Sequence, residues 1–134
     1  MAINQSGKIA RDYFRAYEAD DPDALMRFLH SNYVLYPGGD GKPMNADERR
    51  RDEAVFFSAF SDIGVSIEDQ IAEGDKVANR ITMTGISTGN YRGIPATQKK
   101  VIFPYIDILW IKDGKIVREW VEFDAESILR QIKA

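Results

Sequence analysis

One carboxylate stands among apolar residues that can alter its chemistry. Asp107 interrupts the strand-like run Tyr105-Ile106-Asp107-Ile108-Leu109. Burial disfavours the charged form of a carboxylate, so we expect the pKa of Asp107 to be raised. A neutral acid at this position can donate a hydrogen bond to a substrate oxygen. The structural alternative is an aspartate that bonds to the backbone or to an arginine such as Arg80.

Glu119 is the second candidate, and its distance from Asp107 depends on a hairpin register. The pair Asp113-Gly114 is a strong signal for a two-residue turn, and that register places Asp107 opposite Trp120. A three-residue turn with a bulge places Asp107 opposite Glu119 instead. We favour the second register, in which two carboxyl groups share a pocket and one of them retains its proton.

Further candidates are an acid near the chain end and a set of aromatic side chains. Asp124 precedes Ala125-Glu126-Ser127, where it either caps a helix or acts as an acid or base at a pocket rim. His30, the single histidine, is expected at the surface near a helix end. Large aromatic residues with one polar atom suit a pocket wall, although they also suit a core. As substrate-binding candidates we take Tyr13, Tyr17, Tyr36, Arg80, Trp120 and Phe123.

The elements that must position these side chains follow one another in two groups. Apolar spacing predicts helices from Ile9 to Tyr17, from Pro22 to Leu29 and from about Ala46 to Phe60, the last with Val55, Phe56, Ala59 and Phe60 on its buried side. Extended segments are expected at 32–36, 65–72, 76–87, 100–112 and 115–123, before a short helix at 127–132. Helices followed by an antiparallel meander predict one α+β domain over residues 1–134.

The last long strands are apolar on both faces. Val101, Phe103 and Tyr105 alternate with Ile102, Ile106 and Ile108, whereas a sheet with one wet face alternates apolar with polar residues. One face can meet the helices and a pocket. In a domain this small, the other face most simply meets a second copy, so we expect a homodimer through the sheet.

Composition excludes several classes of site. The chain has 134 residues, no cysteine and a formal net charge of −3, so thiolate chemistry is excluded and no basic footprint for nucleic acid is present. Its basic run Arg49-Arg50-Arg51 lies among acids and is interpreted as a solvated helix face. One histidine predicts no metal site. The absence of export signals and of a ~20-residue apolar span predicts a cytoplasmic protein that does not insert in membranes.

A series of short motifs in order resembles a known family. The motifs are Phe60-Ser61-Asp62-Ile63, Glu73-Gly74-Asp75-Lys76-Val77, Gly85 to Gly89, Gly93-Ile94-Pro95-Ala96-Thr97, Asp107-Ile108, Asp113-Gly114-Lys115-Ile116-Val117 and Glu119-Trp120 through Asp124. The series resembles the SnoaL-like polyketide cyclases, or predicted ester cyclases, of the nuclear transport factor 2-like superfamily.

This resemblance implies a cone-shaped α+β barrel, commonly dimeric, with a pocket between the helices and the concave sheet. It also implies intramolecular aldol chemistry without a cofactor, in which a pocket carboxylate is the acid or base. Where the family usually has Glu-His-Trp-Asp, however, this chain has Arg118-Glu119-Trp120-Val121. Glu119 thus occupies the histidine position and Val121 the position of the catalytic aspartate.

Two functions remain open on these grounds. The first is a cofactor-independent cyclase, isomerase or hydrolase for a small, largely apolar molecule, with Asp107 and Glu119 transferring protons or stabilising an oxyanion. The second is a non-catalytic module of the same fold that binds a small ligand or dimerises, which Val121 favours.

Overall fold

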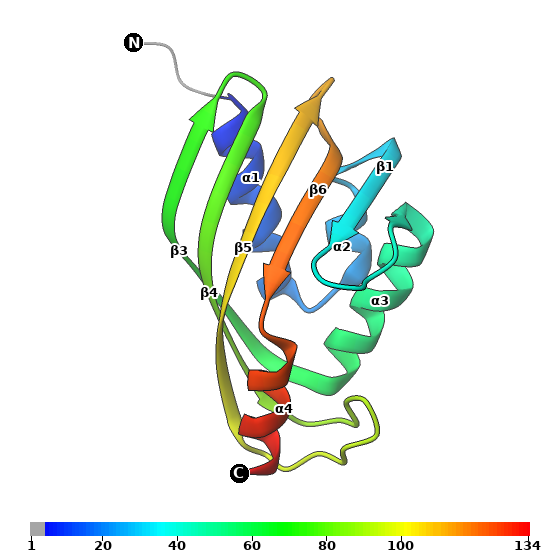
Figure 1. Cartoon of the computed structure of the whole chain (residues 1–134), viewed down its shortest axis with the longest axis vertical. Helices are drawn as coiled ribbons and strands as arrows, with labels where there is room; N and C mark the ends of the chain where they lie inside the picture. The colour runs from blue at the N-terminus through cyan, green and yellow to red at the C-terminus, as the bar shows by residue number, and fades with distance from the viewer. Residues whose placement is uncertain (1–4) are drawn as a thin grey trace.

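The first three helices of this chain lie on one side of a curved sheet, and the C-terminal helix lies at the lower end of the sheet (Figure 1). The computed structural model describes residues 5–134. In chain order, the elements are α1 (Gln5–Ala16), the 3-10 turn η1 (Tyr17–Ala19), α2 (Pro22–Met26), β1 (Leu29–Pro37), β2 (Met44–Asn45), α3 (Ala46–Ala59), β3 (Phe60–Glu73), β4 (Lys76–Ser87), β5 (Lys100–Lys112), β6 (Lys115–Phe123) and α4 (Ala125–Lys133). The predicted α+β class is confirmed.

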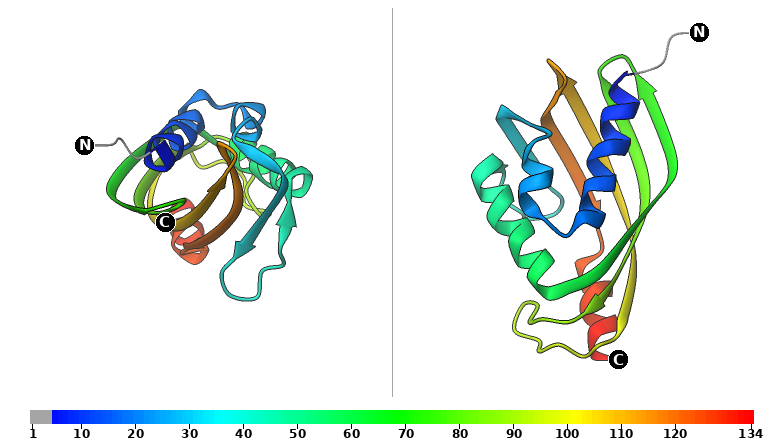
Figure 2. Two further views of the ribbon diagram at one scale, coloured as in Figure 1. Left: turned by 90° about the horizontal axis from the view of Figure 1, so that it is seen from above. Right: turned by 180° about the vertical axis from the view of Figure 1, so that it is seen from behind.

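The sheet has the strand order β2-β1-β6-β5-β4-β3. Neighbouring strands are antiparallel, except that β1 runs parallel to β6. Viewed from above, the sheet curls around α1, α2 and α3, which occupy its concave side (Figure 2). This arrangement is the expected cone, and it creates an interior that is enclosed by helices on one side and by strands on the other.

Local capping explains where the helices begin. Pro22 occupies the first turn of α2 while the Asp21 carboxylate accepts a hydrogen bond from the Asp23 amide at 3.0 Å. Asn45 and Glu48 form a reciprocal capping box at the start of α3. These contacts satisfy amide groups that a helix start otherwise leaves without partners.

Two predicted boundaries were wrong. The second helix stops at Met26 rather than Leu29, because Leu29 already pairs with β6. The first long strand begins at Phe60 rather than at 65, directly after α3. Its start is irregular, since Asp62 has a φ of 51° and the pairing shifts between Ser61 and Gly64, so the apolar alternation is hidden there.

A bulge in β6 decides which residues enter the interior. After the turn, Ile111 pairs with Ile116, but Trp110 pairs with Arg118, so Val117 is an extra residue in β6. Ile116 and Val117 are both buried, and beyond them the alternation changes phase. Side chains in a strand alternate between the faces, so the extra residue turns Glu119 inward.

The two faces of β5 differ as the alternation predicted. The inward residues are Val101, Phe103, Tyr105, Asp107, Leu109 and Ile111, while Ile102, Ile106 and Ile108 are exposed on the outside. Near the start of β5, the Gln131 amide of α4 forms two hydrogen bonds of 2.8 Å with the backbone of Ile102. In residues 5–134 no helix is both long enough and apolar enough to cross a membrane.

Candidate functional site

The two carboxyl groups singled out in the sequence both point into the cone. Asp107 on β5 is 1% exposed and Glu119 on β6 is fully buried. Both registers considered for the hairpin are wrong, because the bulge at Val117 places Asp107 opposite Val121 and Glu119 opposite Leu109. Asp107 and Glu119 are therefore diagonal neighbours on one face, a spacing that long side chains can bridge.

The environment of Asp107 favours its neutral form. Burial is the main cause that raises the pKa of Asp107 well above its ordinary value, followed by the negative charge of Glu119 and a hydrogen bond between the two carboxyl groups. Oδ2 of Asp107 and Oε2 of Glu119 are buried and have no hydrogen-bond partner among the described residues. Two carboxyl oxygens can bond to each other only when one of the two groups carries a proton, and the raised pKa of Asp107 makes it the group that more readily keeps one.

Glu119 is the acceptor at the centre of a tyrosine cluster. Its Oε1 accepts hydrogen bonds from the hydroxyl of Tyr13 on α1 at 3.1 Å and from the hydroxyl of Tyr33 on β1 at 2.7 Å. Burial and the charge of Glu119 raise the pKa of both tyrosines well above 10. Both hydroxyls therefore remain donors over the physiological pH range.

A chain of amides connects Asp107 to the surface. Asn79 Nδ2 on β4 donates to Asp107 Oδ1 at 2.9 Å, and Gln70 Nε2 on β3 donates to Asn79 Oδ1 at 3.0 Å. The guanidinium of Arg11 then donates to Gln70 Oε1 at 2.7 Å. An arginine has donors only, so it fixes the orientation of both amides and makes Oδ1 of Asp107 an acceptor.

A second buried group was missed in the sequence. Arg49, interpreted as part of a solvated face, is 5% exposed, and its NH1 lies 2.6 Å from Oε1 of Glu53, which is also buried. Arg49 NH2 donates to the hydroxyl of Tyr17 at 2.7 Å. The signal was the spacing: Arg49 and Glu53 lie eight and four residues before the buried Phe57, on the same helix face.

The protonation of Glu53 is also altered by burial. Burial is the largest cause that raises the pKa of Glu53 to about 7, while the charge of Arg49 opposes the rise. Neighbouring charges stabilise the guanidinium, so the pKa of Arg49 is raised despite its burial. Among the described residues, the buried charged groups are thus one guanidinium and three carboxyl groups, which cannot all be ionised without net negative charge in the interior.

A cavity of about 110 Å³ opens beside this second group. Its polar lining includes Tyr17, Arg49, Glu53 and Tyr105, and its apolar walls come from Val55, Phe56, Met83, Phe103 and Phe123. Asp107 and Glu119 do not line it. Tyr13 links the two groups, because it donates a hydrogen bond to Glu119 and the nearby charge of Arg49 lowers its pKa against the effect of burial.

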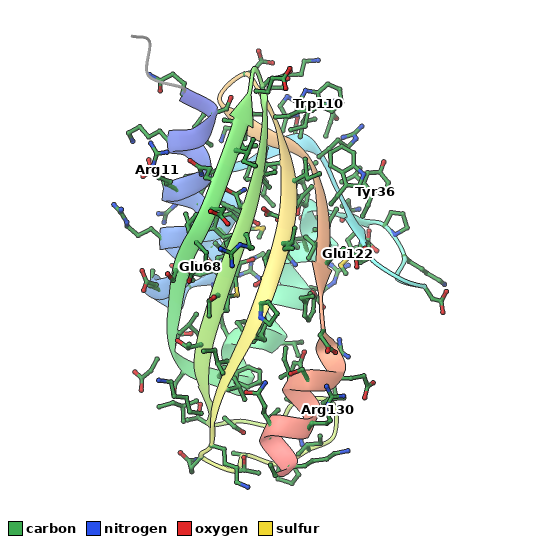
Figure 3. All side chains as sticks on the ribbon, turned by 60° about the vertical axis from the view of Figure 1, so that its left-hand side comes forward. Arg11, Tyr36, Glu68, Trp110, Glu122 and Arg130 are labelled. Atoms are coloured by element: carbon green, nitrogen blue, oxygen red, sulfur yellow. The ribbon has the colours of Figure 1, made fainter. Side chains whose placement is uncertain are left out.

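The remaining predicted site residues fall into two sets. Tyr17 and Phe123 line the cavity, as predicted, and Tyr13 lies one layer deeper. Tyr36 and Trp120 do not line it: they stack on each other outside the sheet at 5.7 Å between ring centres. Figure 3 shows Tyr36 beside β6 on this outer face. The bulge explains the correction for Trp120, since it turns Glu119 inward and Trp120 outward.

Arg80 and Asp124 are also placed away from the cavity. Arg80 points outward and pairs with Asp69 at 2.7 Å, so Asn79 rather than Arg80 is the partner of Asp107. Asp124 caps α4 by accepting a hydrogen bond from the Ser127 amide at 3.0 Å. His30 lies in β1 rather than at a helix end, and its Nδ1 accepts a hydrogen bond from the Asn32 amide.

Comparison with models of known protein families identifies the family of this chain. The model of the SnoaL-like polyketide cyclases matches residues 7–132. The chain belongs to this family. No curated protein matches. Solved structures share the SnoaL-like fold of this chain. The chain superposes on AclR, a putative hydroxylase from Streptomyces galilaeus, with a TM-score of 0.89 at 20% identity. The match covers 98% of this chain and 83% of AclR.

Two further structures have the same SnoaL-like architecture. TsrD from Streptomyces laurentii is 26% identical, with a TM-score of 0.81 and coverage of 98% of this chain and 97% of TsrD. IdmH from Streptomyces antibioticus, a putative polyketide cyclase, is 20% identical, with a TM-score of 0.83 and coverage of 98% and 100%. These likenesses confirm the fold.

Proposed function

We propose that this SnoaL-like protein binds a small, largely apolar molecule inside the cone and transfers protons to or from it without a cofactor, as a cyclase, isomerase or hydrolase does. The observation that carries the proposal is the buried Asp107–Glu119 pair, in which burial and the charge of Glu119 raise the pKa of Asp107. A neutral acid beside a carboxylate acceptor can supply a proton and take one back. Because neither group lines the cavity, the proposal requires the reacting end of the molecule to reach past the cavity lining to this pair.

The connection between this pair and the cavity supports the proposal. Tyr13 donates a hydrogen bond to Glu119 and lies within the electrostatic influence of Arg49, which lines the cavity. Charge that develops on a substrate in the cavity would therefore act on the carboxyl pair through Arg49 and Tyr13. IdmH, which has the same fold, is described as a putative polyketide cyclase, and cyclase chemistry is one of the reaction types proposed here.

A screen of aromatic polyketides, terpenoid epoxides and steroids tests the binding. A ligand present at about 100 times its dissociation constant stabilises the folded state by about 2.7 kcal/mol, which a thermal-shift assay detects. For a compound that is turned over, Asp107→Asn should abolish turnover while Glu68→Gln, on the outside of β3, should not. The proposal fails if no compound raises the melting temperature.

Val121 favours a second candidate, a non-catalytic binding module. It stands where the family usually has its aspartate, and it is buried opposite Asp107. Carboxyl-labelled ¹³C NMR separates the two candidates. Titration of Asp107 at its ordinary pKa would remove the physical basis for catalysis and leave binding alone.

We also propose that the outer sheet face joins two copies of the chain. Ile102, Ile106, Ile108 and Trp120 are all more than a third exposed on this face, and contiguous apolar surface of this kind is typical of interfaces. Analytical ultracentrifugation should show a dimer that Ile106→Glu dissociates. The control Ile71→Glu, on exposed β3, should leave it intact, and a monomeric wild type would contradict the proposal.

A further inference from the structure

The cavity beside α3 contains polar atoms that nothing in the fold uses. Arg49 Nε, Glu53 Oε2 and Tyr105 Oη are buried, and none has a hydrogen-bond partner among the described residues. All three residues line the cavity. A buried polar group without a partner costs about 1–3 kcal/mol, so three of them around one hollow point to a ligand that supplies the missing partners.

We propose that Arg49, Glu53 and Tyr105 form a subsite that holds an uncharged, oxygen-bearing group, such as a hydroxyl or an enolisable ketone, of the bound molecule. This assignment rests on the proposed binding function and specifies its ligand. The Nε–H of Arg49 donates to the ligand oxygen. Glu53 Oε2 and the Tyr105 hydroxyl lie on the same cavity to receive or donate its proton.

The charges around the cavity exclude an anionic group. The Arg49 guanidinium is already paired with Glu53 at 2.6 Å and bonded to Tyr17, so each of its terminal nitrogens already has an acceptor and its charge is already partly compensated. Asp52 lies 3.7 Å from the same guanidinium and also lines the cavity. An added anion would lie beside the carboxyl groups of Glu53 and Asp52, which repel it once they are ionised.

A cationic group is disfavoured by the positive charges at the cavity. Arg49 carries its charge inside the cavity, and Arg92 lines it from the loop between β4 and β5, over the ring of Tyr91. The other ionisable groups around Glu53 are Tyr17 of η1, Asp52 of α3, Tyr105 of β5 and, more deeply, Glu119 of β6. With Arg49 and Glu53 balancing each other, a neutral group fits best.

The walls determine how much of the ligand the cavity can enclose. An engineered apolar cavity of about 150 Å³ holds benzene, so about 110 Å³ encloses one small ring or a ketone-bearing end, but no more. Val55 and Phe123 line the cavity and are 53% and 40% exposed, so they mark its mouth. The rest of a larger molecule would extend past these two side chains.

Three probes of similar size and different charge test the subsite: phenol, benzoate and benzylamine at pH 7. Met83 lines the cavity, whereas Met26 and Met44 do not, so methyl-¹³C methionine NMR reports where each probe binds. Phenol should shift the Met83 methyl signal in a saturable way and leave Met26 and Met44 unchanged. Benzoate and benzylamine should shift it at least ten times less at the same concentration.

Tyr105→Phe removes the free hydroxyl and should weaken phenol binding about three- to ten-fold, the usual effect of one hydrogen bond. Because that hydroxyl has no partner in the fold, the variant should not lower the melting temperature. Tyr36→Phe, the same change on the outer face, is the matched control and should leave phenol binding unchanged.

Several results would overturn the subsite. These are equal binding of benzoate, unchanged phenol binding in Tyr105→Phe, a lower melting temperature of that variant, or no Met83 shift from any probe. None of them decides the proposed function, which stands or falls with the screen of larger molecules. Conversely, a failed screen with a phenol-specific Met83 shift would support the subsite and contradict the larger ligand classes.

Discussion

Two ion pairs of nearly equal length lie on opposite sides of the structure. Arg49 and Glu53 are 2.6 Å apart inside the cone, and Arg80 and Asp69 are 2.7 Å apart on the outer face. Their side chains are 6% and 7% exposed in the first pair, and 55% and 62% in the second. Water screens the outer pair and not the inner one. Residue type and distance alone therefore do not tell which pair has the larger effect on the free energy of unfolding.

Removing one arginine from each pair should give the largest difference. At pH 8, Arg49→Met leaves Glu53 buried without its counter-charge, and we expect a loss of about 3–5 kcal/mol in the free energy of unfolding. Arg80→Met should cost less than about 1 kcal/mol, as exposed pairs do. Urea denaturation of both variants measures this, and similar losses would contradict the comparison.

The outer face was easier to predict from the sequence than the interior. Alternation along β5 identified the outward isoleucines and the buried Asp107, and Asp113-Gly114 marked the turn, where both residues have positive φ angles of 53° and 75°. These features depend on neighbouring residues alone. The hairpin register could not be predicted in the same way, because Ile116 and Val117 are both apolar and fit either phase of β6 equally well.

The charged interior was hidden for a related physical reason. A run of three arginines among acids has the composition of a solvated helix face, yet only Arg50 and Arg51 of that run are exposed. Arg49 becomes an interior residue because Glu53 and Tyr17 satisfy it there. Its partner Tyr17 is distant in sequence, and one-dimensional patterns do not reveal such a contact.

The pH dependence of the free energy of unfolding should also distinguish the inner pair from the outer pair, with an effect somewhat smaller than that of Arg49→Met. The pKa of Glu53 is raised from 4.5 to about 7 in the folded state. Its neutral form therefore stabilises the fold below pH 4.5, and this contribution is lost as the pH rises through 7. At about 1.4 kcal/mol per pH unit, the loss is about 3 kcal/mol.

Glu53→Gln should remove that part of the pH dependence, whereas Glu68→Gln should retain it. Unfolding by urea at several pH values between 4 and 8 provides the measurement. The raised pKa of Asp107 acts in the same direction, so a smaller decline should persist in Glu53→Gln. An unchanged profile in that variant would show that Glu53 is not the titrating group.

Adjacent residues on β4 offer a narrower test of the same comparison. Asn79 donates to Asp107 inside, while its neighbour Arg80 points out. Asn79→Leu should cost about 1–3 kcal/mol, because an oxygen of Asp107 loses its donor. It should also raise the pKa of Asp107 further, since the Asn79 bond lowers it. Arg80→Leu should leave the ¹³C titration of Asp107 unchanged, and a shift there would contradict the separation of the two faces.

The smallest effect is expected for the outer aromatic pair. Tyr36 and Trp120 stack while remaining 36% and 39% exposed, and aromatic pairs contribute about 0.5–1.5 kcal/mol beyond the area they bury. Trp120→Ala should therefore reduce the free energy of unfolding of the monomer by about 1 kcal/mol. A loss comparable to that of Arg49→Met, in urea denaturation at low protein concentration, would place Trp120 among the interior contacts after all.

The extra residue at Val117 determines which side chains of β6 point inward along the rest of the strand. Loss of that residue, or insertion of another one before Glu119, would exchange the inward and outward sets along the rest of the strand. Arg118, Trp120 and Glu122 would then face the helices, and Glu119 would face solvent. A one-residue change in length is therefore far more disruptive to this site than any single substitution within it, and variants of this chain should tolerate insertions between strands but not within β6.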